Sequence, residues 1–261
     1  MKKQTRSILE EIGNMVPVQD RASVVESRAN HVINSAINVL GMIHEHFEPD
    51  VAAELERRLI NSIKGMYVLV PRNMVQAAGF YNKLMELETP ALVIECLNGY
   101  RRKEPLPKNV GDYTTPIGAI EVLQEGTDIT LLTYGSNCVL AQAACDELAQ
   151  MNISVELIDA QSLIPFDLDH AVVESVKKTN ALVVIDEDVR GGASAFLLQQ
   201  ILEDQQGYKY LDAAPLTITS KDHRPAFASD GDYFSKPSVD DMVERIYALM
   251  NERNPSKYPS I

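Results

Sequence analysis

The sequence contains few cysteines for a chain of its length. Only three occur among 261 residues, Cys96, Cys138 and Cys145, and all lie in apolar surroundings. An odd number of cysteines in such surroundings is typical of buried thiols and argues against a disulfide framework. We therefore expect reduced thiols in a reducing compartment.

Basic residues are also scarce relative to acidic ones. The chain has 24 Lys and Arg against 37 Asp and Glu, which gives a formal net charge of −13. This charge repels phosphate backbones and anionic membrane surfaces, so nucleic-acid binding would require a local basic patch. The candidate patches, residues 57–58 and 101–103, are short. We expect neither nucleic acid nor a membrane as a partner.

The sequence lacks a long hydrophobic run. No stretch reaches the length of a membrane span, and the opening MKKQTR precedes no apolar segment of signal-peptide length. The overall hydrophobic content of 45% is nevertheless enough to fill the core of one large domain or two ordinary ones. These features predict a globular, cytoplasmic protein.

Residues 1–64 have a helical pattern throughout. Apolar residues recur at three- and four-residue steps on both sides of a break at Pro49, which predicts a helical hairpin with a packing or assembly role. His44 and His46 might suggest a metal site. Two residues at this spacing point to different faces of a helix, so a solvated surface is the preferred interpretation.

The pattern changes to alternating strands and helices near residue 65. Residues 66–71 and 90–95 are expected to form strands, the second one buried, and residues 74–85 to form the helix between them. This is one parallel β-α-β unit, which by itself leaves sheet edges uncovered. The polar, turn-rich residues 98–116 are expected to form an interdomain linker.

The remainder of the chain predicts a doubly wound, mainly parallel sheet. Strands are expected at residues 117–122, 129–134, 154–158, 181–185 and 216–219. Helices are expected at residues 138–151, 168–178 and 239–251, with another following the strand at 181–185. Residues 223–237 are expected to form a long loop with a docking role. His223 can titrate there near neutral pH, although a purely structural histidine is an equal alternative.

Residues 181–196 carry the most informative pattern. A continuous apolar run predicts a strand covered on both faces, and DEDVRGG at residues 186–192 follows at its carboxyl end, where ligands and partners of open α/β sheets usually bind. The carboxylates Asp186, Glu187 and Asp188 could form a metal or acid–base cluster. Capping of the next turn, or pairing with Arg190, is the preferred interpretation because no triad or His/Cys ligand set accompanies them.

A second strand exit carries the sequence YGS at residues 134–136. Backbone N–H groups at the start of the following helix could bind an anion there. No second glycine follows at dinucleotide or P-loop spacing, so helix capping by Ser136 or Asn137 is preferred.

These residues also carry a family resemblance. The most specific segments are GMYVLVPR (65–72), PALVIE (90–95), GTDITLLTYGS (126–136), IDAQSLIPFD (158–167) and DEDVRGG (186–192). They resemble the β chain of the thiamine-diphosphate-dependent decarboxylating component of 2-oxo acid dehydrogenase complexes, most closely in bacterial forms with fused α and β parts.

The resemblance implies three parts. These are a helical hairpin of unknown origin at residues 1–64, a partial pyrimidine-binding domain with a linker at 65–110, and a transketolase-like C-terminal domain at 111–261. The complete enzyme would decarboxylate pyruvate or a branched-chain 2-oxo acid on thiamine diphosphate with Mg²⁺, and would pass the acyl group to a lipoyl group. Its implied partners are the α part, the lipoyl acyltransferase component and a second copy of the chain.

Two departures from the family pattern affect the expected function. The family's cofactor-binding glutamate and active-site histidine would lie upstream of the matching segments, and residues 87–90 (LETP) replace the family's usual potassium-binding segment. We therefore expect no catalytic residue, no metal site and no bound cofactor in this chain alone. Its expected role is subunit contact and docking. The candidate residues for that role are Tyr100, Arg101, Asp186, Glu187, Arg190, Gly191, Gly192, His223 and Arg224. A non-catalytic assembly protein and a transketolase-type carbon transferase are the alternatives.

Overall fold

The computed structural model describes residues 65–223 and 229–260, all within one compact unit that spans residues 57–261. The predicted hairpin at residues 1–64, with its two histidines, lies outside the described residues, as does Arg224. Within the described ranges, no helix is both long and apolar enough to cross a bilayer.

The larger sheet has five strands in the order β3-β5-β4-β7-β8. Their bounds are β3 Glu121–Gln124, β4 Ile129–Thr133, β5 Val155–Asp159, β7 Leu182–Val189 and β8 Leu216–Ser220. Strands β5, β4, β7 and β8 run parallel to one another, whereas β3 runs antiparallel to β5. The mainly parallel sheet is thus confirmed.

The first strand of this sheet begins later than residues 117–122 predicted. Gly118 has a φ of +82° and its N–H donates to Ser162 Oγ, so the chain turns at this point and cannot yet be extended. Apolar residues at 117 and 120 therefore belong to the turn leading to β3.

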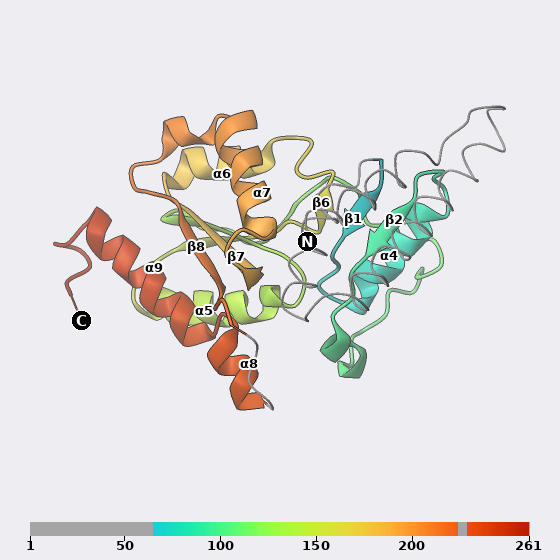
Figure 1. Cartoon of the computed structure of the whole chain (residues 1–261), viewed down its shortest axis with the longest axis horizontal. Coiled ribbons are helices and arrows are strands. Elements are labelled where there is room, and N and C mark those ends of the chain that lie inside the picture. Colours follow the sequence, from blue (N-terminus) through green and yellow to red (C-terminus); the bar gives the residue numbers. More distant parts are fainter. Residues whose placement is uncertain (1–64, 224–228, 261) are drawn as a thin grey trace, which may run out of the picture. The chain divides into compact units, whose positions relative to one another are not determined.

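Helices cover both faces of the larger sheet (Figure 1). On one face lie α5 Asn137–Gln150 and α9 Val239–Arg253, and on the other α6 Ala171–Thr179 and α7 Ala193–Gln199. Alternate side chains of β4 separate accordingly: Leu131 packs in the core beneath α5 and α9, and Leu132 in the core beneath α6 and α7. Coverage on both faces explains why these strands are apolar without alternation.

The predicted loop at residues 223–237 is partly helical. A short helix, α8 Ser229–Ser235, occupies part of the predicted long loop, so that prediction was wrong for these residues. The long helix α9 begins at a capping box, in which Ser238 and Asp241 bond each other's backbone N–H groups, and this fixes its first turn. Helix α7 continues as a π-helical turn at residues 200–204, followed by a 3-10 helix at Gly207–Tyr210.

A second, three-stranded sheet has the order β2-β1-β6. Its strands are β1 Tyr67–Leu69, β2 Ala91–Val93 and β6 Ser162–Ile164, and α4 Met74–Leu84 connects β1 to β2. The predicted parallel β-α-β unit is confirmed. Strand β2 is only partly buried, contrary to expectation, because among the described strands it pairs with β1 alone.

Strand β6 was not predicted from the sequence. It follows β5 almost directly but belongs to the other sheet, where it pairs antiparallel with β1. Gln161 makes this possible: its φ of +58° turns the chain out of the larger sheet after Asp159. The chain therefore passes from β5 in the larger sheet to β6 in the smaller one at a left-handed residue.

Candidate functional site

The carboxyl ends of β4 and β7 form the natural opening of the larger sheet. The chain leaves β4 into α5 on one face, and leaves the neighbouring β7 into α7 on the opposite face. Divergence of two adjacent connections leaves a crevice outside the strand ends, which is where open α/β sheets bind ligands.

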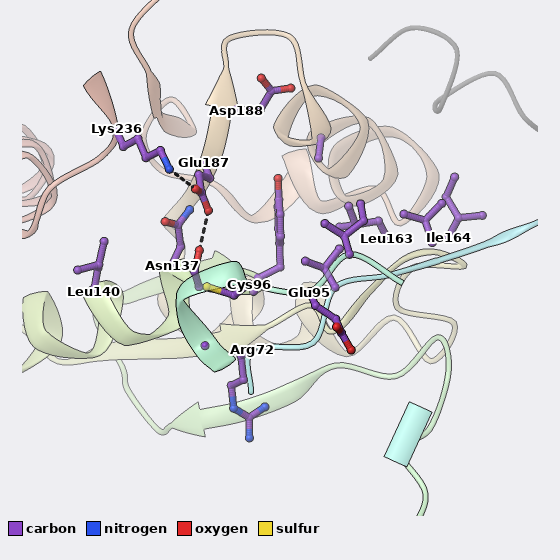
Figure 2. A pocket seen from close by; sticks show the side chains of 18 of the residues that line it. Arg72, Glu95, Cys96, Asn137, Leu140, Leu163, Ile164, Glu187, Asp188 and Lys236 are labelled. Carbon is purple, nitrogen blue, oxygen red and sulfur yellow. Dashed lines mark hydrogen bonds and ion pairs between the residues drawn. The ribbon is translucent and has the colours of Figure 1, made fainter. Parts of the chain in front are cut away.

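A cavity of about 950 Å³ occupies this position. Its walls come from β1, β6, the segment after β2, the start of α5, the end of β7 and the start of α7. Figure 2 shows most of the lining side chains. The lining residues are Val68, Val70, Arg72, Ile94, Glu95, Cys96, Gly99, Arg102, Tyr134, Gly135, Ser136, Asn137, Leu140, Leu163, Ile164, Glu187, Asp188, Ala193, Phe196 and Lys236.

Glu187 is the hydrogen-bonding centre of one wall. Its carboxylate accepts from Ser136 Oγ at 2.6 Å and from Lys236 Nζ at 2.7 Å (Figure 2). Burial raises the pKa of Glu187, but the hydrogen bonds from Lys236 and Ser136 outweigh burial and hold the pKa below its ordinary value. Glu187 is therefore an anion compensated by one cation.

The same contact overturns the predicted role of Ser136. The serine occupies the N-cap position of α5, but its side chain makes no capping hydrogen bond because it donates to Glu187 instead. Asn137 does not cap the helix either, since it is already the first helical residue. The start of α5 thus keeps backbone N–H groups that no side chain caps.

Asp186 lies behind the cavity and is fully buried. Its carboxylate accepts from the Tyr134 hydroxyl, from the Asp188 N–H at 3.0 Å and from the Ser194 N–H at 2.7 Å. Burial and the nearby Asp186 charge raise the pKa of Tyr134. Asp186 therefore caps the turn into α7, as the capping interpretation held. Arg190, the predicted ion-pair partner of the acidic cluster, has an exposed side chain.

Arg72 anchors the smaller sheet to the larger one. Its Nη1 lies 2.6 Å from Glu121 Oε2 and 2.8 Å from Asp159 Oδ2. Gln76 Nε2 donates to the same Asp159 oxygen and to Gln161 Oε1. Sequence reasoning missed this network. The only hint of this network in the sequence was an acidic residue, Asp159, at the end of one expected strand and a basic residue, Arg72, just after another.

The cavity also contains groups without protein partners. Asn137 is 3% exposed, and its Nδ2 has no hydrogen-bond acceptor. Arg102 lines the cavity, is exposed and forms no ion pair with another described residue. Cys96 contributes a half-buried thiol. In the part of the chain that the structure describes, no three His, Cys, Asp or Glu residues are grouped as metal ligands.

The predicted docking residues do not gather at one place. Among those that the structure describes, only Glu187 lines the cavity. Tyr100 and Arg101 are exposed beside it, with the Tyr100 hydroxyl donating to Glu95. Gly191 is exposed whereas Gly192 is buried against Asp188. His223 is exposed and stacks on Phe234 at 5.8 Å between ring centroids.

Comparison with known proteins identifies the part of the chain that forms the larger sheet. Residues 118–236 match the family described as "Transketolase, C-terminal domain". This part of the chain is a transketolase C-terminal domain.

Relatives that match a larger share of the chain are named as β subunits. The chain is 31% identical to the pyruvate dehydrogenase E1 component subunit beta of Rhizobium meliloti (strain 1021), over 72% of this chain and 40% of that protein. It is 34% identical to the mitochondrial 2-oxoisovalerate dehydrogenase subunit beta of Chaetomium thermophilum, over 59% of this chain and 33% of that protein. The resemblance of the transketolase C-terminal domain to that of 2-oxo acid dehydrogenase β subunits is thereby confirmed.

Two further relatives extend the comparison. The acetoin:2,6-dichlorophenolindophenol oxidoreductase subunit beta of Bacillus subtilis (strain 168) is 30% identical, over 74% of this chain and 56% of that protein. A solved structure titled "Split gene transketolase, inactive beta4 tetramer" has the same fold, with a TM-score of 0.58 and 21% identity over 75% of this chain and 61% of that chain. The chain thus spans about half the length of the curated relatives it matches, or less.

Proposed function

We propose that this chain is the C-terminal part of the β subunit of a 2-oxo acid dehydrogenase, acting on pyruvate or a branched-chain 2-oxo acid. The observation that carries the proposal is the transketolase C-terminal domain joined to a preceding β-α-β unit, together with a β-subunit relative that aligns with 72% of the chain. In the complete enzyme, this part supplies subunit-contact and docking surface, and oxidative decarboxylation ends with acyl transfer to a lipoyl group.

The proposed division of the chain follows from this function. Residues 65–110 are the tail of a pyrimidine-binding domain with its linker, residues 111–261 are the transketolase-like domain, and residues 1–64 are a separate segment. Among the described strands, β2 pairs only with β1, and this edge position supports an incomplete sheet, because an edge strand presents unpaired backbone groups to another chain.

Apolar side chains on the surface of this segment support a role in subunit contact. Several large hydrophobic residues between positions 81 and 110 are exposed, and Met85 is 88% exposed. Contiguous exposed apolar surface typically marks a protein interface. The exposed residues are Tyr81, Met85, Leu87, Ile94, Tyr100, Leu106 and Val110. We propose the α part of the enzyme and a second copy as the occupants, with the lipoyl acyltransferase as a further partner, all in the cytoplasm.

The described residues do not fit thiamine diphosphate. A bound Mg²⁺–diphosphate needs several oxygen ligands on the metal, and within the described ranges no cluster of three or more such acids is present. The cavity is also lined by three carboxylates, Glu95, Glu187 and Asp188, which repel a diphosphate. We propose that the cofactor and Mg²⁺ bind to the complete enzyme and not to this chain alone.

Two experiments test the proposal. Isothermal titration of the chain with thiamine diphosphate and Mg²⁺ is expected to give no binding, and tight stoichiometric binding would overturn the proposed division of labour. Mixing the chain with an α part and a polypeptide carrying the missing pyrimidine-binding half is expected to give lipoyl reduction that depends on a 2-oxo acid.

The same mixture separates the alternatives. Activity with sugar phosphates in place of pyruvate or branched-chain 2-oxo acids would make the chain a transketolase-type enzyme part. Acetoin-dependent activity would align it with the Bacillus subtilis relative. Formation of a complex without activity on any of these compounds would make it a non-catalytic assembly protein.

A further inference from the structure

Strand β2 is an edge strand among the strands that the structure describes. It stands at the end of the smaller sheet, in the order β2-β1-β6 (Figure 1). Its residues, Ala91–Val93, are only partly buried, and the following Ile94 is 41% exposed. An edge strand with exposed backbone groups can accept a strand from another chain.

The hydrogen bonds to β1 show which groups of β2 point outwards. Pro90 O accepts from β1 at 2.9 Å, and Ile94 N–H donates to β1 at 2.8 Å. The backbone polar groups of successive strand residues point to opposite sides, so Leu92, midway between these two residues, also faces β1. Ala91 and Val93 therefore direct their N–H and C=O groups away from β1, to the open edge.

This edge lacks the features that usually prevent strand pairing. Such features are a lysine or a proline at an outward-pointing position and a bulge that twists the strand away. The outward-pointing residues are Ala91 and Val93, and β1 and β2 pair in continuous register without a bulge. Pro90 does not block the edge, because its backbone groups lie on the β1 side. The strand is short, so its flanks must contribute to stable pairing.

The flanks of β2 carry opposite charges. Exposed Glu86 and Glu88 precede the strand, and exposed Arg101, Arg102 and Lys103 follow it after a 3-10 helix. Antiparallel pairing of two copies places the acidic flank of each near the basic flank of the other, whereas parallel pairing would place like charges together. Complementary charge therefore favours antiparallel pairing, and a second copy supplies both matching flanks.

We propose that β2 pairs antiparallel with β2 of a second copy of this chain, about a twofold axis at Leu92. Ala91 of each copy then exchanges two backbone hydrogen bonds with Val93 of the other. Ile94 of each copy lies opposite Pro90 of the other. The two Leu92 residues meet on the axis as a non-hydrogen-bonded pair, with their Cα atoms about 4.5 Å apart. Because a twofold contact is closed, the assembly stops at a dimer.

The inference rests on the proposed role in subunit contact and deepens it by naming the strand, the register and the partner. The two proposals can fail separately. Reconstituted lipoyl reduction by a chain that stays monomeric would overturn the dimer and leave the enzymatic function intact. A dimer through β2 without activity in that assay would support the dimer and count against the enzymatic function.

Sedimentation velocity of the full chain over a range of concentrations tests the dimer, and two charge variants test its axis. Leu92→Lys and Leu92→Glu each place two like charges opposite each other, so each should weaken the dimer at least about tenfold. An equal mixture of the two variants should recover dimers, because lysine then lies opposite glutamate. A monomeric parent chain, variants as dimeric as the parent, or a mixture no more dimeric than its components would overturn the proposal.

Leu92→Cys tests the same contact without introducing a charge into the smaller sheet. Two cysteines on the axis, with Cα atoms about 4.5 Å apart, are within the range of a disulfide, so mild oxidation should link the chains into covalent dimers. The parent chain controls for Cys96, and Val122→Cys is the matched control, because Val122 is 41% exposed on β3, an edge strand of the larger sheet. Absence of linkage at position 92, or equal linkage at position 122, would overturn the proposal.

The charged flanks are tested by Glu88→Lys. This variant should weaken the dimer about two- to fivefold, and less at high salt, because the charges are exposed. Glu147→Lys makes the same change of charge at an exposed site on α5 and is the control. Equal effects of the two variants would attribute the loss to net charge and overturn the antiparallel matching of the flanks.

Discussion

The Arg72 guanidinium lies 2.8 Å from the carboxylate of Asp159, and this contact joins the two sheets. Arg72 follows β1 in the smaller sheet, whereas Asp159 ends β5 in the larger one and is fully buried. Glu121 on β3 holds the second edge of the guanidinium at 3.0 Å. Burial works against this charge, but the hydrogen bonds to Glu121 and Asp159 prevail and raise the pKa of Arg72.

Arg72→Met should destabilise the chain by about 3–5 kcal/mol, because it leaves the buried Asp159 without its counter-charge. The free energy of unfolding in urea at neutral pH measures the loss. Arg72→Lys keeps the positive charge but not the forked geometry, so its loss should be smaller.

The pH dependence of the Arg72→Met loss follows from Asp159. Burial raises the pKa of Asp159 above 3.8, and the hydrogen bond from Arg72 partly offsets this effect. A carboxyl with a raised pKa binds its proton more tightly in the folded state, so stability falls as the pH rises from the unfolded to the folded pKa. Removing Arg72 raises the folded pKa further. The deficit of the variant should therefore shrink on acidification, and a deficit independent of pH would contradict this account.

Asp186→Ala should cost about 2–4 kcal/mol, because the buried Ser194 N–H and the Tyr134 hydroxyl both lose their acceptor. Tyr134→Phe removes one of these contacts and should cost about 1–1.5 kcal/mol. Thermal and urea unfolding measure both. Glu147→Ala, at an exposed site on α5, is the control and should stay within about 0.5 kcal/mol. A loss for Tyr134→Phe equal to that for Asp186→Ala would rule out the additional role in capping α7.

Alkylation should separate the three cysteines. Burial raises the pKa of Cys145 to about 12, and burial together with the charge of Asp159 raises the pKa of Cys138. Because the thiolate is the reactive form, both should react slowly with iodoacetamide at about pH 8, whereas the half-buried Cys96 reacts first. Peptide mass spectrometry after timed quenching assigns the sites. All three should react at similar rates in denaturant, and similar rates in the native chain would contradict the burial described.

Two glycines provide a matched pair of substitutions. A Cβ on Gly126 would lie 2.1 Å from the Val155 carbonyl carbon and 2.2 Å from the Glu156 nitrogen, both backbone atoms that cannot move aside. Gly126→Ala should therefore destabilise the chain by about 3 kcal/mol or more. A Cβ on Gly111 meets nothing within 4 Å, so Gly111→Ala should be neutral or stabilise by up to about 1 kcal/mol. Urea unfolding compares them, and equal stabilities of the two variants would show that the β3–β4 turn tolerates displacement.

Much of the fold could be predicted because its elements bury whole strands. The runs that form β4, β5 and β7 are continuously apolar, and that pattern already predicts a parallel sheet covered on both faces. The β-α-β unit before it was predicted for the same reason. The acidic run DEDVRGG was expected to follow the strand, but β7 continues through Val189, so Glu187 lies within the strand near its carboxyl end.

The sequence by itself determined which segments are strands and helices. Its motifs also determined the resemblance to the transketolase-like domain. Both could be predicted because burial patterns and family motifs consist of residues that are neighbours in the sequence. Only the tertiary structure decided which distant groups meet. Gln161 turns β6 into the second sheet, and Arg72 contacts Asp159, 87 positions away in the sequence. The Ser136 hydroxyl donates to Glu187 instead of capping α5. The tertiary structure likewise left Asn137 without an acceptor. Periodicity records that a residue is buried, but the partner of a buried polar group depends on how separate elements pack, and no local pattern contains that information.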